Sequence, residues 1–174
     1  MAPETDGAAT ILQGIDLATL TLEKLDVLPQ SSLDELFSAL AGVNAGDGAG
    51  DMPAGDSRGV AIVGDGAFWR RWIASFAHKY LWQGKVFTRT DADHGVLVNK
   101  VSALDVQAIK AQIYRQDSWY DGKPCIVLDY SKTSFLARKV RDEIRQVRPG
   151  VYLGLVYWGA NKKPLVEFAL DFNR

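Results

Sequence analysis

Apolar and polar residues alternate from residue 80 onward, and short segments rich in Gly, Asp, Asn and Pro interrupt the alternation. A period of two is typical of antiparallel strands, and the interrupting segments have the composition of turns. The pattern predicts strands at residues 80–89, 94–101, 107–117, 123–131, 138–147, 150–158 and 164–172. Seven or eight strands are enough to close a barrel, and such a barrel is filled by side chains or holds one small ligand.

Two of these segments also fit a helix. In residues 103–114, Val106, Ile109 and Ile113 recur at helical spacing. Residues 141–147, "RDEIRQV", are rich in helix-forming residues. A helix therefore stays open as the alternative for both segments.

The last two strands indicate which of their faces are buried. Val166, Phe168 and Leu170 share one face of the last strand while Glu167 lies on the other, which is typical of a half-buried antiparallel strand. In residues 151–158, "VYLGLVYW", both alternating sets are apolar, so we expect this strand to be covered on both faces. These patterns predict a curved sheet or barrel with an aromatic interior.

The N-terminal part of the chain predicts a helical arm followed by a loop. The leucines of residues 11–28 fit neither a helix nor a strand period. Residues 32–41 begin with "SLDE", which has the spacing of a capping box, and they carry one apolar stripe. Residues 42–56 mix Gly, Asp, Ala and Pro without periodicity, so we expect a mobile loop there.

Beyond this loop, the sequence predicts the start of a second unit. Residues from Gly59 to Val63 are a strand candidate, and residues 66–79 place their aromatic side chains at helical spacing. The chain is therefore expected to consist of a helical arm with a Gly-rich loop, residues 1–56, and a β-barrel domain, residues 57–174. The helix 66–79 is expected to plug or flank the barrel.

Charge and cysteine content argue against several classes of function. The chain has 20 Lys and Arg against 21 Asp and Glu, so it lacks the basic excess with which nucleic-acid-binding proteins neutralise phosphates. The single cysteine, Cys125, cannot form an internal disulfide. No apolar run approaches the length of a membrane span, and the N-terminal "MAPETDGAAT" does not have the pattern of a secretory signal. We therefore expect a cytoplasmic protein without a membrane span.

No motif indicates a metal or a cofactor. Gly64-Asp65-Gly66 follows a predicted strand, as in a dinucleotide-binding turn, but Trp69 stands where that motif needs its third glycine. The two histidines, His78 and His94, are far apart in the sequence and form no metal-ligand cluster with the cysteine.

Asp142 is the most informative polar residue. If residues 138–147 form a strand, Asp142 shares a face with two β-branched apolar residues. A carboxylate in that position has a raised pKa or needs a partner; the candidates are Lys85, Tyr130 and Arg141. Asp142 is therefore half of a structural ion pair or a ligand contact. On the opposite face, Arg141 and Arg145 are expected to form a solvated external ladder unless a ligand carries phosphate or carboxylate.

Residues 118–124, "SWYDGKP", predict a hairpin loop because Asp121-Gly122 favours a tight turn. Trp119 and Tyr120 are large and apolar for a loop tip. They either close the mouth of a pocket or pack on the N-terminal arm.

Several short motifs occur in an order that is found in a known family. They are "LWQGKVF" (81–87), Asn99, "SWYDGKPCIVLDY" (118–130), "VRDEIRQV" (140–147), "PGVYLG" (149–154) and "VEFALDF" (166–172). Across residues 80 to 172 the chain resembles the bacterial proteins built from a GXWXG domain and its companion domain of unknown function. The matched positions are Trp82, Gly84, Lys85, Phe87, Asn99, Asp129, Tyr130, Asp142, Leu153 and Gly154. The tryptophan motif that names the family has no counterpart in "DMPAGDSRG", residues 51–59.

The resemblance implies a lipocalin-like (calycin) β-barrel and no established chemistry. Together with the strand pattern, it predicts an α+β, mainly β protein: a small antiparallel barrel with N-terminal helices. The favoured function is the binding of a hydrophobic or amphipathic small molecule, such as an acyl chain, an isoprenoid or a polyketide, in the barrel. The candidate ligand-binding residues are Trp82, Lys85, Asn99, Trp119, Tyr120, Tyr130, Arg141, Asp142, Tyr152 and Tyr157.

Two alternative functions stay open. The first is an isomerase, cyclase or hydrolase in the same barrel, with Asp142 as general acid or base, Tyr130 as hydrogen-bond donor and Lys85 stabilising developing negative charge. The second is a ligandless barrel that acts as an interaction module, through the helix of residues 32–41 or as a homodimer.

Overall fold

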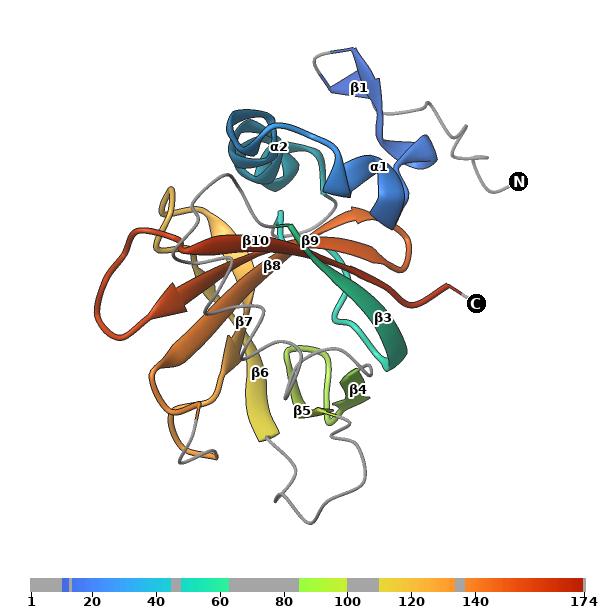
Figure 1. Ribbon diagram of the computed structural model, residues 1–174. Coiled ribbons are helices and arrows are strands. Elements are labelled where there is room, and N and C mark those ends of the chain that lie inside the picture. Colours follow the sequence, from blue (N-terminus) through green and yellow to red (C-terminus); the bar gives the residue numbers. More distant parts are fainter. Residues whose placement is uncertain are drawn as a thin grey trace.

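A computed structural model of the protein describes residues 11–12, 14–44, 48–62, 85–99, 110–133 and 137–173. Its main feature is a closed barrel of antiparallel strands (Figure 1). The strands are β3 (Gly55–Ile62), β4 (Lys85–Arg89), β5 (His94–Asn99), β6 (Lys110–Asp117), β7 (Pro124–Asp129), β8 (Val140–Arg148), β9 (Val151–Trp158) and β10 (Val166–Asp171). Each pairs with the next along the chain, and β10 pairs with β3 to close the barrel. The predicted mainly β barrel is confirmed.

The strand predictions agree with the structure to within a few residues at each end, apart from the first residues of the 80–89 segment, which lie outside the described part. Where the structure describes them, both ambiguous segments are strands. Residues 110–114 belong to β6, and residues 141–147 belong to β8, which is paired on both sides. Pairing with two neighbours therefore overrides the helix propensity of "RDEIRQV". The predicted helix 66–79 and residues 103–109 lie outside the described residues.

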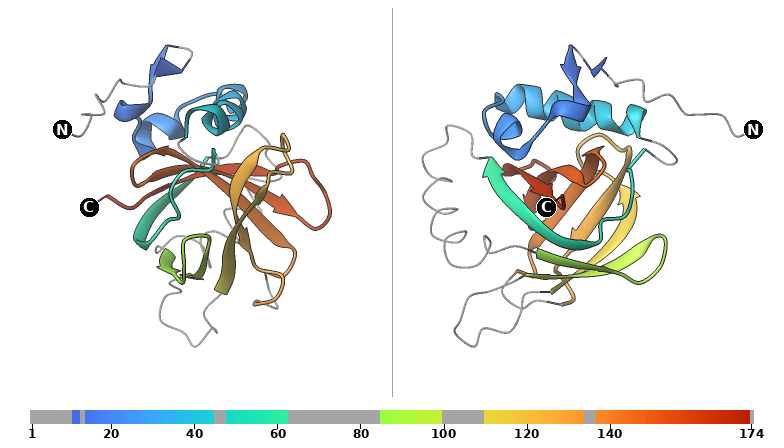
Figure 2. Two further views of the ribbon diagram at one scale, coloured as in Figure 1. Left: turned by 180° about the vertical axis from the view of Figure 1, so that it is seen from behind. Right: turned by 90° about the vertical axis from the view of Figure 1, so that its right-hand side faces the viewer.

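The N-terminal arm consists of short elements and one longer helix. They are β1 (Ile11–Leu12), β2 (Ile15–Asp16), the 3-10 helix η1 (Leu17–Thr19), α1 (Leu22–Asp26) and α2 (Gln30–Val43). In Figures 1 and 2, α1 and α2 lie across the outside of the barrel, over the layer formed by β8, β9, β10 and β3.

A cluster of buried apolar side chains joins this arm to the barrel, and we call it the outer cluster. Leu33, Phe37 and Leu40 of α2 are fully buried in it against Leu153 and Leu155 of β9. The outer cluster is the reason that β9 is apolar on both faces, as the sequence predicted.

The start of α2 differs from the expected capping box. The helix begins at Gln30, and its N-cap is Pro29, which makes no side-chain cap hydrogen bond. The amides of Ser32 and Leu33 donate to the Pro29 carbonyl instead. Proline suits this place because its ring fixes the backbone and it has no amide proton to leave unpaired.

The expectation of a half-buried last strand is wrong, because all six residues of β10 are buried. Glu167, on the outer face of β10, lies beneath α2 with its side chain buried. Burial raises the pKa of Glu167, the nearby Asp34 carboxylate raises it further, and a hydrogen bond from Gln30 Nε2 to Oε1 at 3.0 Å opposes this shift. Because the folded state disfavours the ionised form, this group contributes stability that is gained as the pH falls through the folded pKa and is absent at neutral pH.

Replacing Glu167 by Gln is therefore expected to raise the free energy of unfolding at neutral pH by roughly 0.5–2 kcal/mol. The gain should shrink as the pH is lowered, because the wild-type carboxyl then becomes neutral. Urea unfolding at neutral and acidic pH measures this. Glu35→Gln, a change on the exposed side of α2, is the matched control and should alter stability little. Equal effects of the two changes would contradict the prediction.

Part of the predicted mobile loop closes one end of the barrel. Residues 48–53, which we call the end plug, place Ala49 and Met52 in full burial among the side chains of the barrel interior. The plug is held mainly through its backbone: the amide of Asp51 donates to Gln146 Oε1 at 2.9 Å, and its carbonyl accepts from Tyr152 Oη at 2.9 Å. Other plug carbonyls accept hydrogen bonds from Arg89 and Arg115. Residues 48–53 are therefore an ordered part of the barrel, and the expectation of a mobile loop is wrong for them.

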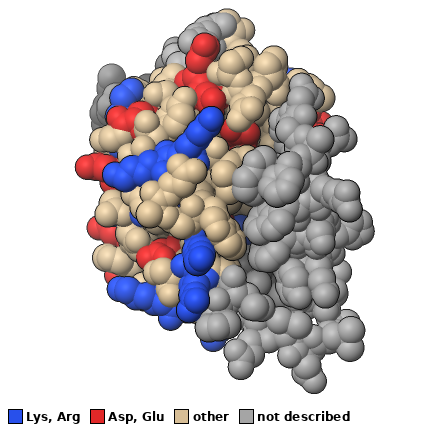
Figure 3. Space-filling view, turned by 60° about the vertical axis from the view of Figure 1, so that its left-hand side comes forward, with Lys and Arg blue, Asp and Glu red and all other residues tan. Residues whose placement is uncertain are grey.

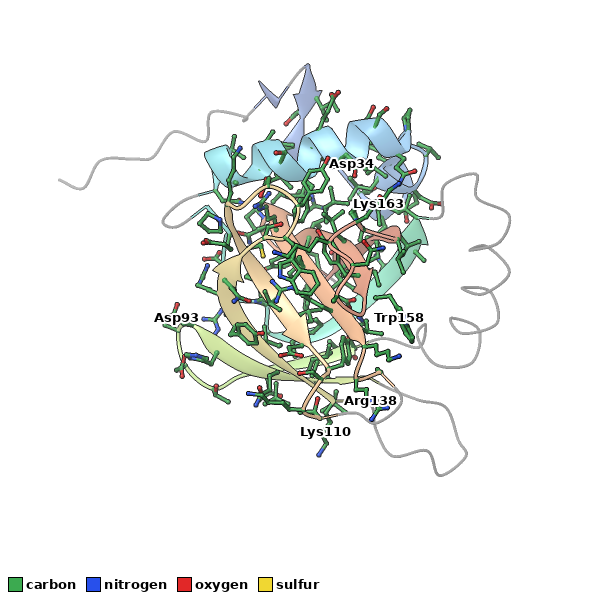
Figure 4. The ribbon with its side chains drawn as sticks, turned by 90° about the vertical axis from the view of Figure 1, so that its left-hand side faces the viewer. Asp34, Asp93, Lys110, Arg138, Trp158 and Lys163 are labelled. Carbon is green, nitrogen blue, oxygen red and sulfur yellow. The ribbon has the colours of Figure 1, made fainter. Side chains whose placement is uncertain are left out.

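The two ends of the barrel differ. Figure 4 shows Asp93, in the β4–β5 hairpin, at one end and Lys110, Arg138 and Trp158 at the other. Asp93 accepts a hydrogen bond from Arg115 at 3.1 Å, and Arg115 also reaches the plug, so the Asp93 end is the plugged one. On the face seen in Figure 3, Lys and Arg are interspersed with Asp and Glu. Among the helices described, none is long and apolar enough to cross a membrane.

Candidate functional site

The inside of the barrel is lined by buried apolar side chains, which form the interior cluster. They come from β4 to β10, because alternate residues of each strand point inward. Members that are at most 3 % exposed include Phe87, Leu97, Ile113, Leu128 and Ile144. The aromatic rings of Phe87 and Tyr152 both pack edge-on against Phe172, with centroid distances of 5.0 and 5.5 Å. The predicted aromatic interior is therefore present.

Three polar side chains meet within this apolar interior. The Nζ atom of Lys85 lies 3.2 Å from Tyr130 Oη and 3.5 Å from Asp142 Oδ2. Tyr130 Oη in turn donates to the same Asp142 oxygen at 3.3 Å. We call Lys85, Tyr130 and Asp142 the polar triad. Two of the three partners that the sequence offered for Asp142 are therefore its partners in the structure.

The strands place the triad near the end of the barrel opposite the plug. Lys85 is the first residue of β4, and Tyr130 directly follows the last residue of β7. Asp142 lies near the start of β8, paired in register with Leu128 and Val156. Alternation then turns all three side chains inward.

The triad is enclosed by apolar and aromatic groups. Lys85 and Asp142 are 6 % and 3 % exposed, and the Lys85 ammonium lies 5.2 Å from the centre of the Phe168 ring. Gly154 makes room for that ring, because a Cβ atom there would stand 2.3 Å from Phe168 Cζ. A bulkier residue at 154 would therefore displace the aromatic wall beside Lys85.

Burial governs the electrostatics of the triad. Desolvation raises the pKa of Asp142, while the Lys85 charge and the hydrogen bonds from Tyr130 and Lys85 act in the opposite direction. The net shift is upward. Asp142 Oδ1 is buried and has no hydrogen-bond partner among the described residues, so all the contacts that hold this carboxylate converge on Oδ2.

Among the predicted site residues whose side chains are described, Tyr152 is the only other one in the interior of the barrel. Its hydroxyl is bonded to the end plug, and burial raises its pKa. Tyr152 therefore lies toward the plugged end and is separated from the polar triad.

Four further candidates lie on the outside of the barrel. Trp119 packs edge-on against Tyr157 with a centroid distance of 5.4 Å, and both belong to or border the outer cluster. Tyr120 is 38 % exposed and contacts Phe37 of α2. Of the two roles left open for Trp119 and Tyr120, the structure supports packing on the N-terminal arm.

Arg141 also points outward. Its guanidinium lies 4.5 Å from the centre of the Trp119 ring and 3.0 Å from Glu143. Glu143 is fully buried and also accepts hydrogen bonds from the Trp119 amide and Ser118 Oγ. These residues fasten the β6–β7 hairpin to β8.

The expected solvated ladder is wrong for Arg145. Its side chain is fully buried beneath α2, with the guanidinium 4.4 Å from the centre of the Phe37 ring. It forms a bidentate ion pair with Asp121, both N–O distances being 2.8 Å. Alternation correctly placed Arg145 on the outer face of β8, but α2 and the β6–β7 hairpin cover that face.

The side chains of two predicted site residues, Trp82 and Asn99, are not among those described. Trp82 lies outside the described residues, and Asn99 is described only through its backbone, as the register partner of Lys85 between β4 and β5. Sequence reasoning missed Phe168 as a neighbour of Lys85. The signal was present, since a glycine at 154 in an otherwise large-residue strand indicates close approach of another group.

Neither the cysteine nor the acidic residues indicate a metal site. Cys125 is fully buried, and burial raises the pKa of its thiol, which agrees with its interpretation as a small core residue. Within the part of the chain that the structure describes, no group of three or more His, Cys, Asp or Glu residues is placed to hold a metal ion.

No protein-family model matches the chain, and no curated protein matches it significantly. Among solved structures, the chain is similar to a protein from Thermomonospora curvata. The two are 16 % identical in sequence, with a TM-score of 0.48 over 84 % of this chain and 89 % of that one. The resemblance to GXWXG-domain proteins stays a prediction.

Proposed function

We propose that the barrel binds a hydrophobic or amphipathic small molecule, with the apolar part among the interior cluster and the polar part at the Lys85–Tyr130–Asp142 triad. The observation that carries this proposal is the triad itself, a group of three polar side chains buried among the apolar side chains of the described interior. Ligand sites of this kind are mostly apolar and contain a few placed polar groups that fix orientation. An acyl chain, an isoprenoid or a polyketide, as predicted from the sequence, likewise combines a large apolar part with a small polar part.

The positions of plug and triad support one orientation of such a ligand. The plug closes the end that carries Tyr152, whereas the triad lies near the other end. A ligand entering at the triad end would leave its polar group at the triad and extend its apolar part toward the plug.

The interaction-module alternative has less support. The apolar stripe of α2, which includes Leu33, Leu36 and Leu40, is already buried against the barrel. A partner protein would therefore need another surface of the arm. The enzyme alternative uses the same triad, and it requires that a bound molecule be chemically changed.

Thermal unfolding and extraction test the proposal together. A ligand present at 100 times its Kd should raise the Tm of a domain of this size by roughly 5–10 °C. We expect such a shift with long-chain fatty acids or prenyl alcohols, and a small molecule released when protein purified from its host is extracted. Mass spectrometry of the recovered compound distinguishes binding, which returns the added molecule unchanged, from catalysis, which returns a product.

A matched pair of variants locates the site. Tyr130→Phe removes a hydroxyl inside the barrel, and we expect it to weaken binding about two- to tenfold, the effect of one hydrogen bond. Tyr120→Phe is the same chemical change on the outside and should leave binding unchanged. If no compound is recovered and neither acids nor alcohols shift the Tm, the proposal is wrong.

A further inference from the structure

The two oxygens of the Asp142 carboxylate have different surroundings. Oδ2 receives both the Tyr130 hydroxyl and the Lys85 ammonium, at 3.3 and 3.5 Å. Oδ1 is equally buried but has no hydrogen-bond partner among the described residues. A buried acceptor without a donor is costly, and native structures pair the great majority of such groups. A ligand group that pairs with Oδ1 therefore needs an O–H or N–H.

The charge of the triad limits what kind of donor fits. Lys85 and Asp142 form an ion pair whose charges sum to zero, and charges interact strongly in an apolar interior. A carboxylate head group would add a second negative charge next to Asp142 and bring no donor. An ammonium head group would add a second positive charge next to Lys85. A hydroxyl group supplies the missing donor and leaves the balance of charge unchanged.

We infer that the ligand of the triad is an uncharged amphiphile with a hydroxyl group, such as a long-chain or prenyl alcohol, and that this hydroxyl donates to Asp142 Oδ1. The inference rests on the proposed function and narrows it, because fatty acids are then disfavoured relative to alcohols of the same chain. The raised pKa of Asp142 agrees with a carboxylate that lacks part of its hydrogen bonding.

A matched series of probes tests this inference on the wild-type protein. The probes are straight-chain primary alcohols from octanol to dodecanol, the carboxylates of the same chain lengths, and the methyl ethers of the same alcohols. Each ether keeps the oxygen and the chain but removes the proton that Asp142 would accept. Kd values come from displacement of a fluorescent apolar dye. We expect each alcohol to bind at least about tenfold more tightly than its ether, the effect of one hydrogen bond to a charged group.

A variant identifies the acceptor. Asp142→Asn keeps the shape of the side chain and adds an amide donor, so the ether can then accept a hydrogen bond. The preference for alcohol over ether should fall to roughly threefold or less. Circular dichroism and thermal unfolding establish that the variant is folded. If it is not, the comparison of probes on the wild-type protein still decides the question.

Each outcome has a distinct meaning. The inference is supported if the alcohols bind with clearly lower Kd values than both the ethers and the carboxylates, and if Asp142→Asn loses this preference. Equal binding of alcohol and ether, or tightest binding by the carboxylate, overturns it but leaves the proposed function standing. If all three classes fail to bind, if prenyl alcohols cause no Tm shift and if no compound is extracted from protein purified from its host, the proposed function itself is overturned.

Discussion

Replacing Arg145 by Ala is expected to lower the free energy of unfolding by about 3–5 kcal/mol, the range found when one partner of a buried ion pair is removed. All five N–H groups of Arg145 are used: Nε donates to the Pro124 carbonyl, and the two terminal nitrogens donate to Asp121 and to the carbonyls of Phe37 and Lys123. The variant removes the donor of three backbone carbonyls and the cation that pairs with the mostly buried carboxylate of Asp121.

The pH dependence of this loss follows from Asp121. Burial alone would raise the pKa of Asp121, but hydrogen bonds from Arg145 and from the Lys123 amide hold it below the ordinary value. A lowered folded pKa contributes stability that is present above the unfolded pKa and is lost as the pH falls through the folded one. The difference in free energy of unfolding between the wild-type protein and Arg145→Ala should therefore become smaller at acidic pH.

Urea unfolding of two further variants controls the result. Arg58→Ala breaks an ion pair with Asp171 in which the Arg58 side chain is 65 % exposed, so it should cost at most about 1 kcal/mol. Arg145→Lys keeps the charge but has no planar fork of five donors, and it should rescue only part of the loss. A cost for Arg145→Ala no greater than that for Arg58→Ala would show that the buried network is not stabilising.

Replacing Lys85 by Met is expected to lower the free energy of unfolding by a similar amount, about 3–5 kcal/mol at neutral pH. The reason is that Asp142 is then a buried carboxylate without its cation. The Lys85 charge is among the causes that lower the pKa of Asp142, so its removal raises that pKa further. A raised folded pKa means that stability is lost as the pH rises through it. The deficit of Lys85→Met should therefore shrink at acidic pH, which denaturant unfolding at two pH values measures.

A double variant separates the ion pair from the packing. Lys85→Met with Asp142→Leu removes both charges, and such apolar replacements of buried pairs are often neutral or stabilising. We expect the double variant to be clearly more stable than Lys85→Met alone. Lys132→Met changes an exposed lysine and should have little effect. The single variant Asp142→Leu completes the comparison. If the stability lost by the double variant equals the sum of the losses of the two single variants, coupling between Lys85 and Asp142 is contradicted.

The sequence predicted the barrel and the centre of the candidate site because both depend on alternation. A period of two set the strands and placed Asp142 on the apolar face of β8. A buried carboxylate then needs a cation or a donor, and few inward positions offered one. Lys85 and Tyr130 were two of the three partners that the sequence offered for Asp142. The third, Arg141, contacts Glu143 and Trp119 on the outer face of β8 instead.

The environment of Arg145 and the role of residues 48–53 were not predictable in the same way. Alternation gives the face on which Arg145 lies but does not say what covers that face, and the cover comes from a helix more than a hundred residues earlier in the sequence, as in the contact with the Phe37 carbonyl. The end plug is held mainly by its backbone groups, which are the same in every residue. In the sequence, its glycines therefore indicate only a linker and not a packed segment.

The pairing of β3 with β10 has a consequence for how the chain acquires its structure. This seam joins residues 58–62 to residues 167–171, so the ring of strands is completed by two segments that are more than a hundred residues apart in the sequence. Contacts between residues so far apart in the sequence form slowly, because the chain loses loop-closure entropy before the contacts can stabilise it. On the ribosome, α1 and α2 emerge early but cannot bury their leucines until β9 and β10 follow, and during that interval the growing chain exposes the apolar surface that chaperones recognise.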